Sequence, residues 1–542
     1  MSAPSPFPEV PADRAQMQWD AWADDSGDGS RKAHLPPGAR AVASALLTGR
    51  PRPVARREPG DVRLSPSRLT ADDLSALGGV TAITTEHAAR LRHVGGRSTP
   101  DLLARRTAVH TPAPDAVVSP ASHDETAAVL RVCAELGIAV IPFGGGTSVV
   151  GGLDPADGGH RAVVSLDLSR TAALLDLDEV SLLARFGAGT TGPQAEELLG
   201  RHGLTLGHFP QSFEYATVGG FAATRSSGQA SRGYGRFDDL VHALRVATPA
   251  GDLALGVAPA SAAGPDLREL FLGSEGALGV LTEVTVRVRR RPAVTAYAAW
   301  TFPDFDAGAT ALRELTQRDV RPTVVRLSDA AETRINALMG GHLTRLRGCL
   351  AIATFDAETA QDAEAARSAT AAVFDRHGGR LRGEDPARSW ERGRFAAPAL
   401  RDALLDIGVL AETLETATTW DRLSTLKDAV TRALTATLTA AGTAPVVMCH
   451  ISHVYPSGAS LYFTVVAALT DDPATQWSAA KAAASAAIVA AGGTITHHHA
   501  VGRDHRAYLE AEIGALGIEV LRAVKRTVDP SGIMNPGALV TR

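Results

Sequence analysis

Short apolar runs alternate with helical patterns through much of the first half of the chain. Residues 116–119 and 139–141 are short segments rich in valine, isoleucine and alanine, which is typical of buried strands. Between them, residues 124–136 have helical spacing, with Ser122 or Asp124 available as the N-cap. The pattern predicts an α+β domain.

A second alternating region follows the Arg-rich break at Arg289–Pro292. Strands are predicted near residues 296–302, 350–355 and 459–467, and helices near 306–318, 359–376, 421–441 and 474–491. A helical pattern also covers residues 70 to 110 and the tail beyond about residue 500. The predicted organisation is an N-terminal arm and helical region (1–110), an α+β domain (111–292), an α/β second domain (293–500) and a C-terminal helical segment (501–542).

The most informative polar segment interrupts the first of these domains. The apolar run at residues 137–141 leads into Gly144–Gly146, followed by Thr147 and Ser148. Glycines allow positive φ, so successive backbone N–H groups can converge on one anion, and the hydroxyls add donors. No Lys-Ser/Thr pair follows, so this is not a Walker loop. The alternative is a glycine-rich turn between strands.

Two more glycine- and hydroxyl-rich loops follow, at residues 210–228 and 273–283. Three such loops suit an extended dinucleotide better than a mononucleotide, and Arg225 is expected to face its pyrophosphate. The residues predicted to bind this cofactor are Pro142, Phe143, Gly144, Gly145, Gly146, Thr147, Ser148, Gln211, Ser212, Phe213, Glu214, Tyr215, Ala216, Thr217, Thr224, Arg225, Ser226, Ser227, Glu275, Gly276, Ala277, Leu278, Gly279, Val280 and Leu281.

A competing motif, GxGxxG, occupies Gly187–Gly192 between a predicted strand and a predicted helix. That context is typical of a Rossmann dinucleotide site. However, no acidic residue ends a strand about 20 residues later, where Pro210 and Gln211 stand instead. The motif is therefore interpreted as a structural element.

Candidate chemistry gathers near the end of the second domain. His497, His498 and His499 are consecutive, and Tyr455 lies just before a Pro-Ser-Gly turn. The favoured interpretation places the histidines in a catalytic pocket as proton carriers or anion binders. Metal ligation and satisfied structural histidines are the alternatives, and no resident metal is expected. In the strand that follows, alternation places Ser460 and Tyr462 on one face.

The three loops, in order and spelling, resemble the PCMH-type (vanillyl-alcohol oxidase) flavoprotein superfamily. The segments Tyr455–Phe463, His497–Gly502 and Val524–Pro530 narrow this resemblance to the alkyldihydroxyacetonephosphate synthase family. Residues 400–402, 412–417 and 17–22 support it. The related FAD-linked 2-hydroxy-acid dehydrogenases carry Glu-His-Gly where this chain has His498-His499-Ala500.

The resemblance implies a two-domain α+β fold in which residues 111–292 form a PCMH-type FAD-binding domain and residues 293–500 a cap domain, with residues 501–542 packing back on the flavin site. It also implies exchange of the acyl group of acyl-dihydroxyacetone phosphate for a fatty alcohol. By position, Tyr455 matches the family's general acid/base and Arg401 its substrate-binding arginine. Arg326 and the stretch His497–His499 match residues important for activity. The alternatives are an FAD-linked oxidase or dehydrogenase of a 2-hydroxy acid or alcohol, and a non-catalytic carrier that uses the histidine cluster.

Composition constrains partners and compartment. The net charge of −5 and the scattered arginines argue against a nucleic-acid partner. Cys133, Cys349 and Cys449 lie far apart without zinc spacing, which favours a reduced cytoplasm. No apolar signal core or membrane-spanning run is evident. We expect a homodimer that acts on a small-molecule or lipid substrate and contacts a membrane peripherally.

Overall fold

A four-stranded sheet forms the first part of the fold in the computed structural model, which describes residues 16–23, 35, 47–48, 53–54, 56–339 and 347–541. Its strands, in spatial order, are β2 (Ala82–Thr84), β4 (Ala116–Ser119), β6 (Ala162–Asp167) and β5 (Ile138–Phe143). The last three are parallel, and α5 (His123–Leu136) makes the crossover. Ser122 caps this helix, and Gly137 ends it at φ 64°. The predicted strands and helix are confirmed here.

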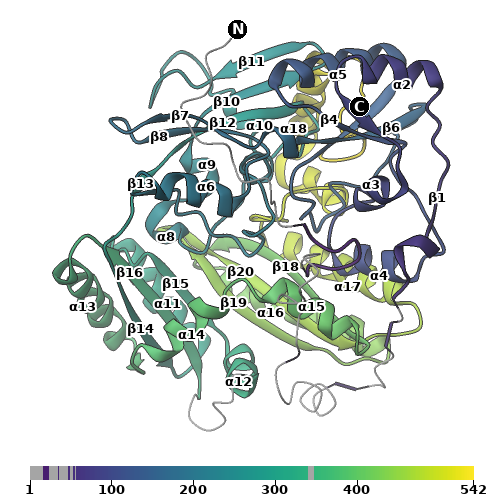
Figure 1. Cartoon of the computed structure of the whole chain (residues 1–542). Coiled ribbons are helices and arrows are strands. Elements are labelled where there is room, and N and C mark those ends of the chain that lie inside the picture. Colours follow the sequence, from purple (N-terminus) through teal and green to yellow (C-terminus); the bar gives the residue numbers. More distant parts are fainter. Residues whose placement is uncertain are drawn as a thin grey trace.

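An antiparallel sheet completes the N-terminal half (Figure 1). Its strands, in spatial order, are β11 (Gly251–Leu255), β10 (Val241–Thr248), β12 (Val280–Arg287), β8 (Leu183–Gly187) and β7 (Leu174–Asp178). The helices α6 (Gly192–Gly200) and α7 (Val218–Ala223) share a core with it, in which Phe186, Phe221 and Val284 are fully or almost fully buried.

The second half of the chain is built on a seven-stranded sheet. Its strands, in spatial order, are β17 (Arg380–Leu381), β14 (Val294–Phe302), β16 (Cys349–Ala357), β15 (Val324–Ser328), β19 (Val446–Val454), β20 (Gly458–Ala468) and β18 (Val409–Thr419). The helices that share its core are α11 (Phe305–Gln317), α13 (Ala360–Arg376), α16 (Leu423–Ala440) and α17 (Pro473–Ala490). All the strands and helices predicted for this region are present, within a few residues.

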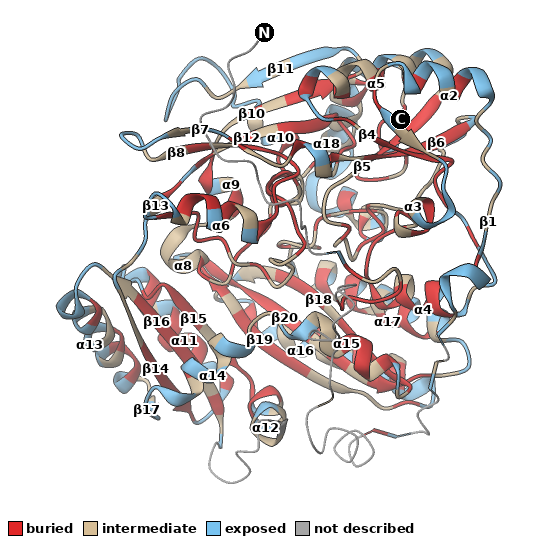
Figure 2. Ribbon diagram, in the orientation of Figure 1, coloured by how far each residue is buried: buried red, intermediate tan, exposed pale blue. Residues whose placement is uncertain are grey.

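Period-two alternation gives this sheet two different faces. On β20, Leu461, Phe463 and Val465 belong to the apolar core shared with the helices, whereas Tyr462 and Thr464 line a cavity on the opposite face. β19, β15 and β18 alternate in the same way. Figure 2 shows the resulting buried interior along these strands. The helix-covered face stabilises the domain, and the other face carries the site.

The region from 70 to 110, predicted to be helical throughout, also contains the short strand β2. Its helices are α2 (Ala71–Gly78), α3 (His87–Arg92) and α4 (Thr99–Thr107). β2 was missed because three residues are too few to establish a period of two. The shorter elements elsewhere are β1 (Arg63–Leu64), β3 (His110–Thr111), β9 (Leu204–Thr205), α8 (Ser231–Tyr234), α9 (Phe237–Leu240), α10 (Arg268–Phe271), β13 (Arg289–Arg290), α12 (Ala330–Met339), α14 (Asp385–Gly393) and α15 (Ala397–Leu405).

The described part of the N-terminal arm docks on the body of the protein. Met17 and Trp22 are buried, and Trp19 is half-buried. The Trp22 indole Nε1–H donates to the Arg97 carbonyl at 3.0 Å, and the Trp22 backbone N–H donates to Asp402 at 2.9 Å. The rest of the arm lies largely outside the described residues.

The C-terminal segment forms α18 (Arg506–Val528), which bends at Gly514, where φ is 74°. The buried Lys525 ammonium donates to Asp529 and to two backbone carbonyls, and so ties this helix to the N-terminal half. In the part of the chain that the structure describes, no helix is both long and apolar enough to cross a membrane.

Candidate active site

A cavity of about 620 Å³ lies where the glycine-rich loops of the N-terminal half meet the open face of the seven-stranded sheet. Residues 142–148 and 275–281 contribute to one side, and β15, β19 and β20 contribute to the other. In Figure 1 these two groups of elements face each other across the middle of the molecule. The sequence-predicted loops, far apart in the chain, are therefore brought to one place.

The glycines after β5 are required by close packing between the first and second loops. A Cβ atom on Gly145 would lie 2.1 Å from the Tyr215 carbonyl oxygen, and one on Gly144 would lie 2.5 Å from the Thr217 hydroxyl. Gly146 has φ +73°, which disfavours any side chain. The loop therefore presents bare backbone to the cavity, which fits the close approach of a dinucleotide's phosphates.

Most of the predicted cofactor residues line this cavity. They are Pro142, Phe143, Gly144, Gly145, Gly146, Thr147, Ser148, Gln211, Ser212, Ala216, Thr217, Thr224, Ser226, Ser227, Glu275, Gly276, Gly279, Val280 and Leu281. The predicted residues outside its wall are Phe213, Glu214, Tyr215, Arg225, Ala277 and Leu278. Three loops with many wall positions are enough to hold an extended cofactor.

Arg225 requires a correction. Its guanidinium pairs with Asp238 at 3.2 Å and with Glu269, and its Nε–H donates to the Leu272 carbonyl at 3.0 Å. These partners hold the guanidinium, and Arg225 is not among the residues of the cavity wall, where it was expected to face a pyrophosphate. The loop sequence could not reveal this, because Asp238 and Glu269 belong to later segments.

The GxGxxG segment, by contrast, is structural as interpreted. A Cβ on Gly187 would lie 1.7 Å from the Thr171 carbonyl oxygen, and one on Gly189 would lie 1.9 Å from that of Leu168. None of the three glycines of this motif is part of the cavity wall. They allow β8 and α6 to pack closely against neighbouring backbone.

A buried carboxylate organises the histidine loop between α17 and α18. Glu415, on β18, accepts the backbone N–H groups of His497, His498 and His499 at 2.5, 3.1 and 2.9 Å, and the Thr496 hydroxyl at 2.6 Å. Burial alone would raise the pKa of Glu415, but the neighbouring histidines and the Thr496 hydroxyl lower it well below its usual range. Glu415 therefore remains an anion that fixes the loop.

The histidines themselves are held neutral. Burial lowers the pKa of His498 and brings that of His499 to about 3, and it lowers the pKa of His497 well below its usual value. His498 and His499 line the cavity, and His497 lies behind them. A neutral imidazole has one donor and one acceptor nitrogen, so it can pass a proton through its ring.

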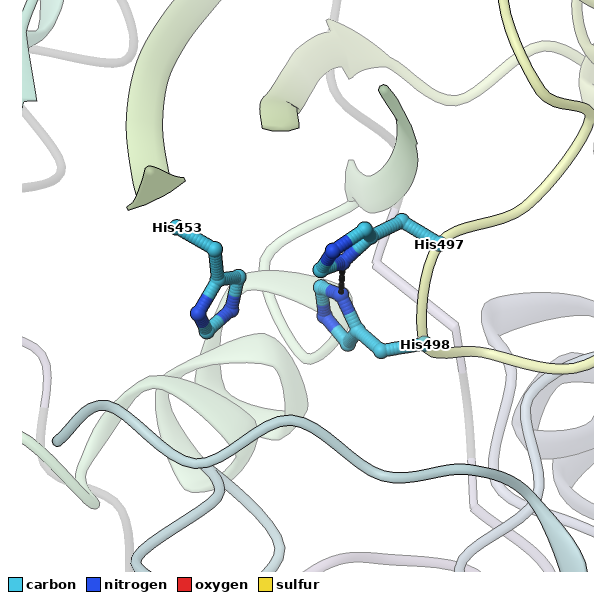
Figure 3. A group of neighbouring side chains, drawn as sticks. All are labelled: His453, His497 and His498. Atoms are coloured by element: carbon cyan, nitrogen blue, oxygen red, sulfur yellow. Dashed lines mark hydrogen bonds between the residues drawn. The ribbon is translucent and has the colours of Figure 1, made fainter. Parts of the chain in front are cut away.

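Figure 3 shows His453 beside His497 and His498, with candidate ligand nitrogens within 4.8 Å of one another. Both ring nitrogens of His497 already have partners: Nδ1 lies 3.0 Å from His498 Nδ1, and Nε2 lies 3.0 Å from Arg236 Nη1 and 2.6 Å from the Tyr455 hydroxyl. A guanidinium in contact with the cluster opposes binding of a cation. The geometry favours a hydrogen-bonded network over metal ligation.

The two tyrosines of this region, Tyr455 and Tyr462, lie in different environments. The Tyr455 hydroxyl lies 2.6 Å from His497 Nε2, but Tyr455 lines a separate surface depression rather than the main cavity. The phenol on the cavity wall is that of Tyr462, whose ring stacks on His450 at 4.9 Å and on His498 at 5.9 Å. Its hydroxyl donates to Gln211 at 3.3 Å. The resemblance matched Tyr455 to the acid/base position, whereas strand alternation placed Tyr462 only on the same face as Ser460.

Two predicted arginines do reach the cavity wall. Arg401, on α15, makes only long contacts, of 3.3 Å to the Arg97 carbonyl, 3.4 Å to Glu412 and 3.3 Å to the Thr413 hydroxyl. Arg326, on β15, is held more firmly by Glu332 at 2.6 Å and lies 3.0 Å from His450 Nδ1. Glu332 and His450, like Glu415 and Arg236, were not singled out from the sequence.

The remaining wall is largely apolar and comes from the second half of the chain. Its apolar residues there include Val324, Ile335, Trp390, Leu400, Leu404, Val446, Met448 and Val466. These positions lie on the cavity-facing sides of β15, β19 and β20 and on the helices α12, α14 and α15. The cavity thus joins a charged, histidine-rich part to a long apolar part.

Comparisons with known proteins agree with this geometry. Residues 114–254 match the family model "FAD binding domain", and residues 291–539 match "FAD linked oxidases, C-terminal domain". Alkyldihydroxyacetonephosphate synthase of Trypanosoma brucei brucei is 30% identical over 519 residues, covering 91% of this chain and 84% of the relative. The Dictyostelium discoideum protein of the same name is 31% identical over 474 residues, covering 83% and 77%. A solved alkyldihydroxyacetonephosphate synthase structure superposes with a TM-score of 0.82 at 28% identity, covering 96% of this chain and 98% of that one.

Proposed function

Since this chain belongs to the alkyldihydroxyacetonephosphate synthase family and is an FAD-dependent enzyme, we propose that it exchanges the acyl group of acyl-dihydroxyacetone phosphate for a fatty alcohol. The products are the alkyl ether and the free fatty acid. The observation that carries the proposal is the cavity, in which Arg401 and the histidines adjoin an extensive apolar wall.

Arg401 is proposed to bind the substrate phosphate. Its present contacts are all 3.3 Å or longer, and its guanidinium fork can bind phosphate oxygens in a bidentate fashion. Arg326, on β15, is proposed to assist Arg401 in binding the phosphate, and Glu332 holds the Arg326 guanidinium in place. An acyl or alkyl chain would lie along the apolar wall, where removal from water favours binding.

When bound, FAD supplies the flavin ring on which the covalent chemistry of the exchange depends. The residues proposed to hold it are the wall positions of the three loops, together with the Gln211 amide. Tyr462 is proposed to hold and move the proton at the substrate carbon, because its phenol lies on the wall beside both Gln211 and His498. Burial raises the pKa of Tyr462, so its phenol starts with a proton to donate and can accept the substrate's proton only after giving its own away.

The direct test is product formation by the purified FAD-bound protein. Incubation with palmitoyl-dihydroxyacetone phosphate and hexadecanol under anaerobic conditions should give the hexadecyl ether and palmitate by mass spectrometry. Tyr462→Phe should retain FAD and lower kcat by about 100-fold or more. Flavin bleaching by a 2-hydroxy acid, with no ether formed, would instead identify a dehydrogenase.

We also propose that the protein acts in the cytoplasm as a homodimer that takes lipid substrates from a membrane surface. The three cysteines are free and buried, which suits a reducing compartment. Light scattering after gel filtration tests the dimer, and co-flotation with vesicles that contain hexadecanol tests the membrane contact. A monomer, or a protein that stays below the vesicles, would contradict the respective proposal.

A further inference from the structure

Three side chains make a continuous line of hydrogen bonds between the surface and the cavity. The Tyr455 hydroxyl lies 2.6 Å from His497 Nε2, and His497 Nδ1 lies 3.0 Å from His498 Nδ1. Figure 3 shows the second of these bonds. Tyr455 is partly exposed and lines the surface depression, whereas His498 lines the cavity. This line of hydrogen bonds therefore runs from a residue of the surface depression, Tyr455, to a residue of the cavity wall, His498.

Arg236 sets the direction of the donors along this line. Its guanidinium can only donate, so His497 Nε2, 3.0 Å away, must accept. A neutral His497 then carries its proton on Nδ1 and donates it to His498 Nδ1. His498 in turn carries its proton on Nε2, the ring nitrogen left for a bound substrate. Because the Arg236 guanidinium can only donate, it fixes the tautomer of His497, and the tautomer of His497 then fixes that of His498.

His453 supports the line without belonging to it. Its Nδ1 contacts the hydroxyls of Ser227 and Ser231 at 3.1 and 2.6 Å, and its ring stacks on His497 with centroids 5.1 Å apart. Glu415 fixes the backbone of the two relay histidines from the other side. The rings are therefore held in register, as proton transfer between them requires.

We propose that Tyr455, His497 and His498 form a proton relay between solvent and the cavity, with Arg236 as the residue that positions its tautomers. This rests on the proposed exchange, in which the acyl group leaves as an acid and so takes up one proton. His498 would donate its Nε2 proton to the leaving group. His497 would then pass its Nδ1 proton to His498 Nδ1, and the Tyr455 hydroxyl would pass its proton to His497 Nε2. Water in the depression then reprotonates Tyr455.

The second half of the exchange returns the proton. The fatty alcohol loses its hydroxyl proton as the new C–O bond forms, and the same transfers run in reverse to solvent. One proton enters and one leaves per turnover, so no charge accumulates in the buried cavity. Arg236 lies beside the Tyr455 oxygen and stabilises it whenever it is briefly deprotonated.

The test uses the full-length FAD-bound enzyme. Tyr455→Phe should lower kcat by about 10-fold or more while KM and FAD content stay unchanged, because the phenol does not touch the substrate. In Tyr455→Ala, added imidazole should restore kcat in a concentration-dependent way, since removing the ring leaves a space beside the depression that residue 455 lines. Tyr508→Phe, which removes a partly exposed phenol elsewhere, is the control and should behave as wild type. A Tyr455→Phe enzyme with wild-type kcat, or a Tyr455→Ala defect that imidazole leaves untouched, would overturn the relay.

A second measurement separates the relay from the proposed reaction, because it needs no substrate. In protein labelled with ¹⁵N-histidine, the ring nitrogen shifts of His497 should report a proton on Nδ1, and those of His498 a proton on Nε2. Arg236→Gln should disturb this pattern. The opposite tautomers in the wild type would refute the relay even if the ether is formed, whereas a missing ether product with these tautomers in place would refute only the reaction.

Discussion

The Glu415 carboxylate accepts the backbone N–H of His499 at 2.9 Å and so joins β18 to a loop 84 residues later in the chain. The same carboxylate accepts the N–H groups of His497 and His498. One buried anion thus satisfies three backbone donors in a segment that has no regular secondary structure. Without it, those donors would be buried without partners, which costs about 1–3 kcal/mol each.

Glu415→Gln should therefore loosen the histidine loop. The amide keeps one acceptor oxygen but places an NH₂ group against backbone N–H donors. We expect the free energy of unfolding to fall by about 2 kcal/mol or more, together with a lower kcat. Urea denaturation and turnover of the variant check this, with the exposed Glu358→Gln as control. Unchanged stability and unchanged kcat would show that the carboxylate charge is not needed.

The elements of the fold could largely be predicted because each carries a local signal. The strand at residues 116–119 and the helix at residues 124–136 could be predicted from hydrophobic periodicity and helix capping alone, and the structure contains both elements. Contacts across the chain had no such signal. Nothing in the sequence around Glu415 indicates that it contacts the backbone of His497 in the fold. Likewise, nothing around Arg225 indicates that its guanidinium pairs with Asp238.

The tyrosines illustrate a second limit. Tyr455 and Tyr462 lie close together in sequence, but a turn between β19 and β20 separates them, so that Tyr462 lines the cavity and Tyr455 lines the surface depression with its hydroxyl at His497. A resemblance by position could not separate these two environments. Alternation grouped Tyr462 with Ser460 on one strand face but did not indicate which face meets the cavity.

Gly145→Ala should abolish cofactor binding. The added Cβ would lie 2.1 Å from the Tyr215 carbonyl oxygen, a backbone atom that can move only if the first and second loops separate. The absorbance ratio of flavin to protein in the purified variant measures occupancy. Gly60→Ala is the matched control, because nothing lies within 4 Å of its Cβ position. Full FAD content in Gly145→Ala would mean that these loops do not hold the cofactor.

Arg401→Lys should raise KM for a phosphorylated substrate by about 10-fold or more, since an ammonium cannot reproduce the planar fork. The effect on kcat should be smaller if Arg401 contributes mainly uniform binding. Steady-state kinetics over a range of substrate concentrations separates the two constants. An unchanged KM would indicate that Arg401 serves only its contacts with Glu412 and Thr413.

Asp402, the neighbour of Arg401, should make stability depend on pH. Burial raises the pKa of Asp402 to about 7, against the opposing effect of Arg106, while its carboxyl accepts the N–H groups of Trp22 and Ala23. The folded pKa exceeds the unfolded value of about 4, so the native state binds this proton more tightly. Its contribution to stability is therefore complete below about pH 4 and is lost as the pH rises toward 7.

Asp402→Asn keeps an acceptor for the arm but cannot ionise. Relative to wild type, the variant should gain stability as the pH rises from 5 to 8, and the two melting curves should converge toward acidic pH. Asp375→Asn, which changes an exposed carboxylate, should run parallel to wild type throughout. Thermal melts at intervals of half a pH unit resolve the difference. If the gap between Asp402→Asn and wild type stays constant across this range, Asp402 is ionised in the native state and the arm is held by an anion.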